Sequence, residues 1–372
     1  MRRHTLFAIV LLIGSSLPSA AEVLYSVTDL GTLGGSYTQG RSLNNAGQVT
    51  GDSYTADGAR HAFFYANGQM QDLEAGTSGF VYSVGYGINN SGQITEERTT
   101  GVSTTSTGMT HAFIYSNGQI TDLGTLGGKS SAGLAINDVG QVTGWADTAG
   151  ATGSHAFLYT KGQMQDLGAL GGIGSYGTSL NNAGQIAGFA YLPQGIYHAF
   201  LYSNGQMIDL NPPGSRNSEA LAINNAGQVI GSAQVGPFGY THLFIYSDGQ
   251  TTDVPSNYLL GESINNAGQI VGNAGDHHAI LYSGGQLYDL NKLIDPALHL
   301  TLDDATAIND NGQIVVNQHI GYTEGTYLYR SYLLTPIPEP STWALLSVSM
   351  LGGGAWVRRR SRVKRMIAEP RA

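Results

Sequence analysis

Six histidines recur along this 372-residue chain, and each is followed by an aspartate eleven positions later. An imidazole can hydrogen bond to a carboxylate, and the same two groups are also metal ligands. One histidine and one carboxylate supply too few ligands for an ion, and pairs in separate repeats lie too far apart to share one. We therefore interpret the pairs as structural contacts and predict no metal site. The pairs are His61 and Asp72, His111 and Asp122, His155 and Asp166, His198 and Asp209, His242 and Asp253, and His278 and Asp289.

Three groups of charged residues interrupt the repeated pattern. Paired carboxylates hydrolyse glycosidic bonds when they lie about 5 to 10 Å apart across a sugar. Adjacent acidic residues in loops are more often simply solvated, and neither a phosphate-binding glycine loop nor a serine elbow is present. We therefore predict no catalytic residue and no cofactor. The three groups are Glu96-Glu97-Arg98, Asp276-His277 and Asp303-Asp304.

Asparagine-rich turns and scattered tyrosines offer two further kinds of site. Most of the turns read Asn-Asn-Ala-Gly, which carries no charge, so we interpret them as turns rather than calcium loops. Six tyrosines fall outside the repeat, in segments that we assign to loops between strands or blades, where rings pack or stack on sugars or peptides. They are Tyr37, Tyr176, Tyr191, Tyr197, Tyr240 and Tyr258.

The elements that must position these residues repeat seven times. The string Ile/Leu-Asn-Asn/Asp-x-Gly-Gln recurs at intervals of 45, 48, 44, 43, 41 and 44 residues. A period of about 44 residues is typical of propeller blades. Each unit divides into four strands; in one unit we expect them at 220–224, 228–233, 242–246 and 250–254. Asn-Gly and Asp-Gly turns between them favour tight hairpins, so each unit is predicted to be an antiparallel meander.

The two ends of the array predict that it closes. The last unit supplies three strands, at 305–309, 313–318 and 327–334, while residues 25–30 resemble an unpaired fourth strand. Closing the ring in this way hides the sheet edges. We therefore predict an all-β fold, a seven-bladed β-propeller over residues 22–335. An open solenoid is the alternative, but it would leave the first strand unexplained.

Composition agrees with this fold and excludes several others. The chain has 53 glycines but only 12% charged residues, which favours tight turns and buried strands over helical bundles. It contains no cysteine, which excludes disulfide scaffolds, thiolate metal sites and thiol nucleophiles.

Both termini carry targeting patterns. Arg2 and Arg3 precede an apolar stretch and the small residues 19–21, which predicts a signal peptide over residues 1–21 with cleavage after Ala21. Residues 336–372 contain Pro338, Glu339 and Pro340 followed by an apolar segment, 341–357, which we predict to be a short transmembrane helix. A basic cluster then holds the tail on the cytoplasmic side. It comprises Arg358, Arg359, Arg360, Arg362, Lys364 and Arg365.

This C-terminal arrangement resembles the PEP-CTERM sorting signal of Gram-negative bacteria. The resemblance implies an exosortase as processing partner, after signal peptidase, and a transient stay in the inner membrane. The His-Ala-Phe strings are similar to those of HAF-type extracellular repeat proteins, a family that brings no assigned chemistry. The seventh unit departs from that pattern, with Tyr327-Leu328-Tyr329 in the expected place.

Together these patterns predict a surface-sorted, non-enzymatic binding or display module of the extracellular matrix or exopolysaccharide layer. An extracellular lyase or glycosidase and a purely structural matrix protein are the alternatives. Residues 22–337 contain 8 basic and 24 acidic residues, a formal charge of −16. This charge disfavours nucleic acid as a partner and leaves polysaccharide or an envelope protein. The expected location is the cell surface or beyond after processing, or the membrane if the tail is retained.

Overall fold

The computed structural model describes residues 25–75, 80–100, 109–150, 153–236, 239–254, 259–275, 277–323 and 326–338. Residues 25–336 form a compact unit of their own. In the described ranges, no helix is both long and apolar enough to cross a membrane. The predicted signal peptide (1–21), Glu339, Pro340, the apolar segment 341–357 and the basic cluster lie outside these ranges.

Every repeat folds into the predicted four-stranded meander, and the strands run somewhat longer than the turn residues suggested. The unit expected at 220–254, for example, has strands at 215–223, 229–235, 240–247 and 250–254. The turn between the third and fourth strands needs a left-handed backbone, which Asn67 and Gly68 adopt with φ of 53° and 77°. The sequence therefore specified the number and order of strands correctly.

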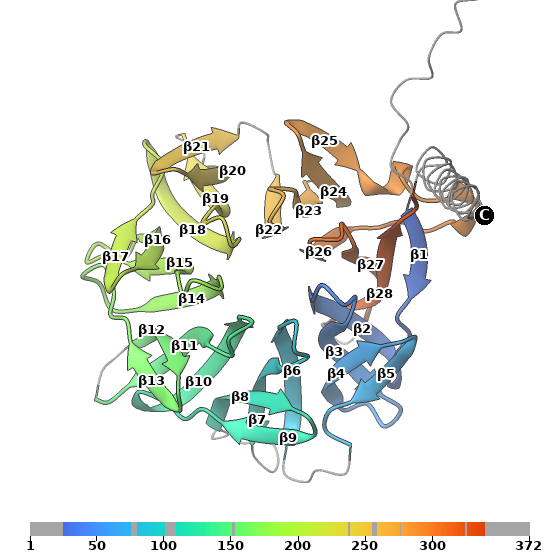
Figure 1. Cartoon of the computed structure of the whole chain (residues 1–372), viewed down its shortest axis with the longest axis horizontal. Helices are drawn as coiled ribbons and strands as arrows, with labels where there is room; N and C mark the ends of the chain where they lie inside the picture. The colour runs from blue at the N-terminus through green and yellow to red at the C-terminus, as the bar shows by residue number, and fades with distance from the viewer. Residues whose placement is uncertain are drawn as a thin grey trace, which may run out of the picture. The chain divides into compact units, whose positions relative to one another are not determined.

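The four strands of each meander have distinct places. The first strands surround the centre of the unit in Figure 1 and are β2 (Gly34–Leu43), β6 (Phe80–Ile88), β10 (Gly127–Ile136), β14 (Ser175–Leu180), β18 (Ser215–Ile223), β22 (Leu260–Ile264) and β26 (Asp304–Ile308). The second strands are β3 (Val49–Thr55), β7 (Ile94–Thr100), β11 (Val142–Thr148), β15 (Ile186–Tyr191), β19 (Val229–Val235), β23 (Ile270–Ala274) and β27 (Ile314–Thr323). The third strands are β4 (Arg60–Ala66), β8 (Met109–Ser116), β12 (Ser154–Thr160), β16 (Tyr197–Ser203), β20 (Tyr240–Ser247), β24 (His278–Ser283) and β28 (Thr326–Pro336). The outermost strands are β5 (Gln69–Asp72), β9 (Gln119–Asp122), β13 (Gln163–Asp166), β17 (Gln206–Asp209), β21 (Gln250–Val254), β25 (Gln286–Asp289) and β1 (Tyr25–Asp29).

These strands form five four-stranded sheets and one eight-stranded sheet. The eight-stranded sheet joins the first two meanders through a single parallel pair, Arg60 with Tyr82. One four-stranded sheet combines the two ends of the unit, because β1 pairs antiparallel with β28 from Tyr25 opposite Pro336 to Asp29 opposite Tyr332. The result is an all-β, propeller-like fold.

The register of β1 corrects the sequence alignment of the last repeat. In the first repeat Asp72 lies opposite Phe63, the third residue of His-Ala-Phe. Asp29 lies opposite Tyr332, so Arg330-Ser331-Tyr332 occupies the His-Ala-Phe place, and Tyr327-Leu328-Tyr329 does not. Arg330 takes over the role of histidine, with its Nη1 3.6 Å from Asp29 Oδ2.

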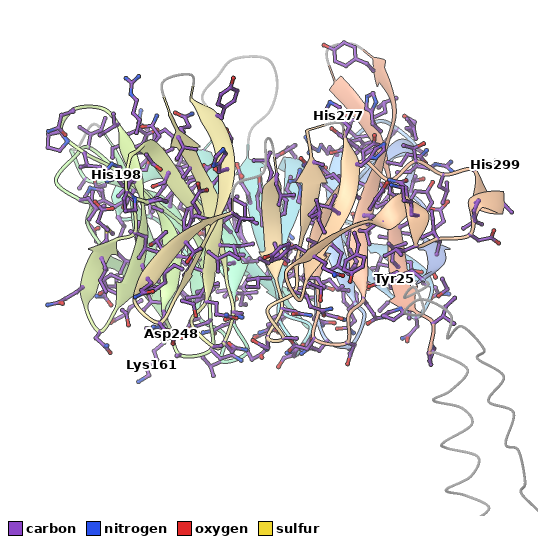
Figure 2. The ribbon with its side chains drawn as sticks, turned by 90° about the horizontal axis from the view of Figure 1, so that it is seen from above. Tyr25, Lys161, His198, Asp248, His277 and His299 are labelled. Carbon is purple, nitrogen blue, oxygen red and sulfur yellow. The ribbon has the colours of Figure 1, made fainter. Side chains whose placement is uncertain are left out.

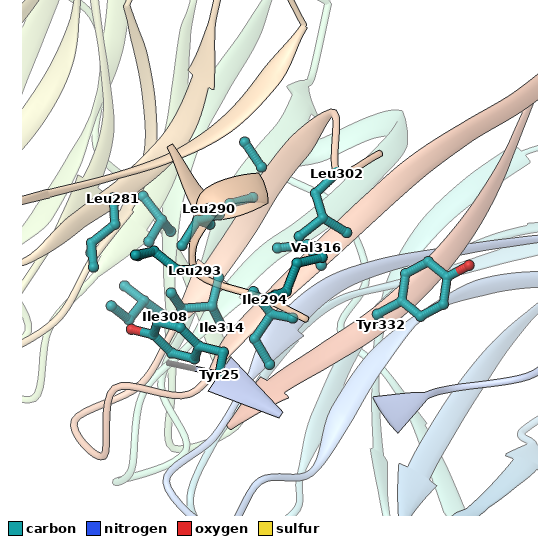
Figure 3. Close-up of a cluster of buried hydrophobic side chains, with 14 residues drawn as sticks. Tyr25, Leu281, Leu290, Leu293, Ile294, Leu302, Ile308, Ile314, Val316 and Tyr332 are labelled. Carbon is teal, nitrogen blue, oxygen red and sulfur yellow. The ribbon is translucent and has the colours of Figure 1, made fainter. Parts of the chain in front are cut away.

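Apolar clusters fill the spaces between neighbouring sheets. The largest surrounds the joint between the two ends of the unit (Figure 3), where Tyr25 of β1 packs with Leu290, Leu302 and Ile314. Leu290 belongs to the short 3₁₀ helix η1 (Leu290–Lys292), which is followed by η2 (Pro296–Leu298). The main-chain N–H of Tyr25 donates to the Leu293 carbonyl at 2.9 Å. The first strand is therefore held by side-chain burial as well as by sheet hydrogen bonds.

The two faces of the unit differ in their connections. Figure 2 shows Lys161 and Asp248, which lie in turns between third and fourth strands, at one face and His277, between β23 and β24, at the opposite one. In a meander the turn between the first and second strands lies on the same face as the turn between the third and fourth. We call this the turn face, and we call the face of His277 the mouth face.

Candidate functional site

Seven buried asparagines form a ring of hydrogen bonds at the turn face. Each side-chain Nδ2 donates to the main-chain carbonyl of the corresponding asparagine in the next repeat, at 2.9–3.1 Å. Each Oδ1 accepts main-chain N–H groups of its own turn, as Asn44 does from Ala46 and Gln48. These residues therefore shape their own turn and also join neighbouring repeats, a role that the sequence analysis missed. The ring comprises Asn44, Asn89, Asn137, Asn181, Asn224, Asn265 and Asn309.

The residues that follow these asparagines form a second ring, exposed to solvent. Each main-chain N–H donates to the side-chain Oδ1 of the next member, at 2.8–3.0 Å. All the side chains are thus engaged within the protein, and no calcium-type loop of acidic residues is formed. The members are Asn45, Asn90, Asp138, Asn182, Asn225, Asn266 and Asp310.

Two cavities lie along the axis of the ring. One, of about 160 Å³, is lined by the two asparagine rings. The other, of about 210 Å³, is lined by first-strand residues nearer the mouth face, among them Arg41, Tyr86 and Glu262. Apolar residues such as Leu43 and Ile88 line both cavities and therefore lie between them. The larger cavity, which we call the mouth cavity, thus has an apolar base.

Residues that differ from repeat to repeat gather around the mouth cavity. Its wall includes the residue three positions before each ring asparagine: Arg41, Tyr86, Leu134, Thr178, Leu221, Glu262 and Thr306. Two positions earlier on the same strands come Gln39, Val84, Ala132, Tyr176, Glu219, Leu260 and Asp304. Their partners on the second strands are Asp52, Glu97, Trp145, Phe189, Ser232, Asn273 and Asn317. The seven repeats have similar residue types at the turn face and different residue types at the mouth. This difference makes the mouth the candidate functional site.

The first two repeats contribute cationic and phenolic groups. Arg41 Nε and Arg60 Nε bind the two oxygens of buried Asp52 at 2.7 and 2.5 Å. The Arg41 guanidinium also lies 5.4 Å from the centre of the Tyr86 ring. Burial raises the pKa of Glu97, although its hydrogen bond with Tyr86 and the nearby arginines oppose the shift. Both arginines are therefore committed to partners within the protein.

The third and fourth repeats contribute an aromatic wall. Tyr176 stacks on Phe189, with ring centres 5.0 Å apart and an interplanar angle of 15°. Trp145 lies 6.2 Å from Tyr176, and Tyr197 lies 5.6 Å from Phe189. These rings are half-buried, so they are neither core residues nor isolated surface residues.

The fifth to seventh repeats contribute carboxylates. Burial, followed by the charges of Asp304 and Glu219, raises the pKa of Glu262 to about 7. Asp304 accepts a hydrogen bond from Asn273 at 3.0 Å, and Glu219 accepts one from Ser232 at 3.1 Å. Within the described residues, no cluster of three or more histidine, aspartate and glutamate side chains could hold a metal ion.

The candidate pair Glu96 and Glu97 does not form one site. Successive residues of a strand point to opposite faces, and Glu97 faces Tyr86 while Glu96 is buried beside Arg98. Arg98 also binds Glu74, which follows β5, at 3.0 Å. This buried cluster of two carboxylates and one guanidinium joins the first two repeats. Burial raises the pKa of Glu96 to about 7, although Arg98 opposes the shift.

The residues of the other candidate groups do not form a common site either. Asp304 faces the carboxylates of the mouth, whereas Asp303 accepts a hydrogen bond from the main-chain N–H of His319 at 2.7 Å. His277 occupies a left-handed turn (φ 60°), and Asp276 and Tyr258 lie outside the described residues. The assignment of the other five tyrosines to loops was wrong, because Tyr37, Tyr176, Tyr191, Tyr197 and Tyr240 all lie in strands.

The spacing of eleven brings each repeated histidine to its aspartate. The shortest distance from Nδ1 to the carboxylate is 2.8–3.0 Å in five pairs and 3.5 Å between His278 and Asp289. Several of these aspartates also accept a main-chain N–H from the following linker, as Asp166 does from Gly168 at 2.7 Å. The pairs therefore lie where the third and fourth strands meet the linker to the next repeat.

No protein-family profile matches the chain, and no curated protein sequence matches it. Among solved structures it is similar to a puromycin-hydrolysing peptidase of Mycobacterium tuberculosis, with a TM-score of 0.46 and 10% identity over 82% of this chain and 56% of that one. It is also similar to the GH93 α-L-arabinofuranosidase of Fusarium graminearum, with a TM-score of 0.39 and 7% identity over 84% and 98% of the two chains. TolB from Acinetobacter baumannii matches with a TM-score of 0.37 and 10% identity over 81% of this chain. The chain spans about half the length of TolB and of the peptidase.

A simple sequence signal would have located the mouth. If the repeats are aligned on their asparagines, the positions three and five before it and eight after it vary widely in residue type. The candidate groups predicted from the sequence were assigned to loops, whereas the residues that vary lie inside strands.

Proposed function

We propose that the protein is an exported, surface-sorted and non-enzymatic seven-bladed propeller whose mouth binds extracellular polysaccharide. The observation that carries this proposal is the gathering of repeat-breaking residues around one cavity: Tyr86 and Glu262 line it, and Tyr176, which stacks on Phe189, lies on a strand that borders it. Half-buried rings offer apolar faces to sugar rings, and convergent polar groups fix orientation. A rigid scaffold that displays one variable face suits a binding or display module of the matrix.

The seven-bladed ring itself belongs to this proposal. In it, each meander is one blade, and β1 completes the blade of β26, β27 and β28. The pairing of β1 with β28 supports the closure, as does the hydrogen bond from Asn309 to the Asn44 carbonyl. Closure would place a neighbouring blade against both faces of every sheet and leave only short, protected edges.

Export and sorting rest on the sequence of the two ends. We propose that signal peptidase cleaves after Ala21 and that an exosortase processes the tail near Pro338, Glu339 and Pro340. The segment 341–357 would be a transient inner-membrane helix. Mass spectrometry of the mature protein from its host tests this, and a C-terminal peptide that still contains Trp356 would show that the tail is retained as an anchor.

Incubation of the purified full-length protein with the host's exopolysaccharide tests the binding function. Retention of the polysaccharide without new reducing or unsaturated ends is the expected result. Chain scission would instead establish an enzyme. The absence of both retention and scission would favour a purely structural matrix protein.

Glycoside hydrolysis is a second candidate, favoured by the hydrogen bond between Tyr86 and Glu97 at the mouth. In such a reaction Glu97 would accept the phenolic proton as Tyr86 attacks the sugar carbon, an acid such as Glu262 would protonate the departing oxygen, and water would release the sugar. Burial and the charge of Glu97 raise the pKa of Tyr86, which keeps the phenol protonated. For that reason we rank hydrolysis second; if scission is observed, Y86F and E97Q should each abolish it.

A further inference from the structure

The mouth presents an aromatic wall and a carboxylate wall, and this asymmetry defines the class of sugar that it suits. Resting on the proposed polysaccharide binding, we infer that the mouth takes a neutral glycan whose rings stack on Trp145 and Tyr176 and whose hydroxyls donate to Glu262 and Asp304. A glycan rich in uronic acids is disfavoured at the same place. Three observations carry the inference.

The rings of the aromatic wall are held in place by contacts with one another. Phe189 stacks on Tyr176 and fixes its plane, while Tyr191 and Tyr197 pack around Phe189 at 6.3 and 5.6 Å between ring centres. Tyr176 precedes the cavity residue Thr178 by two positions on β14, which places it about 7 Å nearer the mouth face. A ring held in this way loses little freedom when a sugar stacks on it.

The carboxylate wall offers acceptors that the protein does not use. Among the described residues, the side chain of Glu262 has no hydrogen bond or ion pair, although it is half-buried in the cavity wall. Asp304 accepts hydrogen bonds from the Asn273 side chain at 3.0 Å and from the main-chain N–H of Ala305. Sugar hydroxyls are donors of the right kind for the remaining oxygens, because carboxylates accept strong hydrogen bonds from O–H groups.

The balance of charge selects against anionic sugars. Arg41 is the basic residue in the wall of the mouth cavity; its Nε donates to Asp52 and its Nη2 to Gln39, both at 2.7 Å. Above pH 7, where Glu262 is ionised, a uronate would meet the carboxylates of Glu262 and Asp304, while the charge of Arg41 is paired with Asp52.

Trp145 provides a direct probe of this site. The chain has three tryptophans, and the other two, Trp343 and Trp356, belong to the C-terminal tail. In the full-length protein with W343F and W356F, indole fluorescence therefore reports on Trp145 alone. Arabinan, galactomannan and dextran serve as neutral probes, and polygalacturonate serves as the anionic one, all at the same low ionic strength.

We expect at least one neutral polysaccharide to shift the emission of Trp145 in a saturable way, and polygalacturonate to bind at least tenfold more weakly. Tyr176→Ala should lower the affinity about tenfold. The matched control is Tyr288→Ala on β25, a tyrosine that is 38% exposed and remote from the cavity wall, which should change the affinity less than twofold. The double variant E262Q/D304N should bind polygalacturonate more tightly and the neutral probe more weakly than the parent does, so that the difference in affinity between the two probes shrinks.

Two results would overturn the inference: equal binding of polygalacturonate and the neutral probes, or unchanged neutral binding by a Tyr176→Ala variant that unfolds at the parent's urea midpoint. Retention of the host exopolysaccharide by that variant with unchanged affinity would leave the binding function standing and refute this site. If the parent binds neither the probes nor the host exopolysaccharide, the site and the proposed function fail together.

Discussion

The side-chain amide of Asn309 donates a hydrogen bond of 2.9 Å to the main-chain carbonyl of Asn44, a residue 265 positions earlier. This bond completes a circuit that passes through all seven repeats at the turn face. The circuit uses the same asparagine that shapes each turn. One recurring residue type in each repeat therefore serves local folding and the contact between repeats at once.

Replacing Asn309 with alanine removes four hydrogen bonds, two within its own turn, one to Gln313 and one to Asn44. Because the groups left behind are largely buried, we expect the free energy of unfolding to fall by about 2–4 kcal/mol. Urea denaturation followed by circular dichroism measures this change. The control is Asn225→Ala in the exposed ring, which should cost less than about 1 kcal/mol; equal losses would refute the special role of the buried ring.

Tyr25 anchors the first strand and is 4% exposed. Tyr25→Ala leaves a cavity beside Leu290 and Ile314, so we expect a loss of about 3 kcal/mol in urea denaturation. Ser26, its exposed neighbour on the same strand, provides the control, because Ser26→Ala should change stability by about 0.5 kcal/mol or less. A Tyr25→Ala protein as stable as the parent would mean that β1 contributes little to holding the fold together.

The buried Glu96 predicts a dependence of stability on pH. Burial raises the pKa of Glu96 to about 7 in the folded protein, above its ordinary value of 4.5. The protonated form is therefore favoured by folding, and its contribution is complete below about pH 4.5 and is lost as the pH rises through 7. The pKa of Glu262 is also raised to about 7, so its contribution to stability is likewise lost as the pH rises. Urea midpoints should fall between pH 5 and pH 8, less steeply in E96Q and least in E96Q/E262Q; a parallel decline in all three proteins would contradict the prediction.

His155 and Asp166 lie 2.8 Å apart and are 24% and 44% exposed. A double-mutant cycle with His155→Ala and Asp166→Ala should give a coupling energy of about 0.5–1 kcal/mol, as is usual for partly exposed ion pairs. We expect the metal content, measured by elemental analysis, to be the same before and after the substitutions. Stoichiometric loss of a metal from the His155→Ala protein would make the pair a ligand set instead of a structural contact.

The sequence predicted the meanders well because their turns need specific residues. Asn-Gly and Asp-Gly pairs mark the third-to-fourth strand turns, and the left-handed backbone of Asn67, Asn117, Asn204 and Asp248 explains why. The constant spacing of His155 and Asp166 likewise reflects a fixed register of two paired strands. Local geometry of this kind depends on a few neighbouring residues, so the residue types alone reveal it.

The mouth could not be found in the same way. Residues such as Trp145, Glu219 and Glu262 belong to different repeats; their variable types stand at fixed offsets from the ring asparagines, but the sequence does not show that they lie close together. The pairing of strands around one axis brings them together. The alternation of side chains along a strand, by contrast, would have placed Glu96 and Glu97 on opposite faces if residues 94–100 had been assigned to a strand.

The pairing of β1 with β28 also determines when the first strand can be paired during synthesis of the chain. Ser26 and its partner Thr335 are 309 positions apart, so the first strand to be synthesised has no partner until nearly the whole unit has been made. Contacts of such long range form late, because closing a long loop is entropically costly. A chain that stops before β28 leaves β1 unpaired, and an unpaired strand promotes association with other incomplete chains. Only a chain that has been synthesised as far as Pro336 can therefore pair its first strand along its whole length.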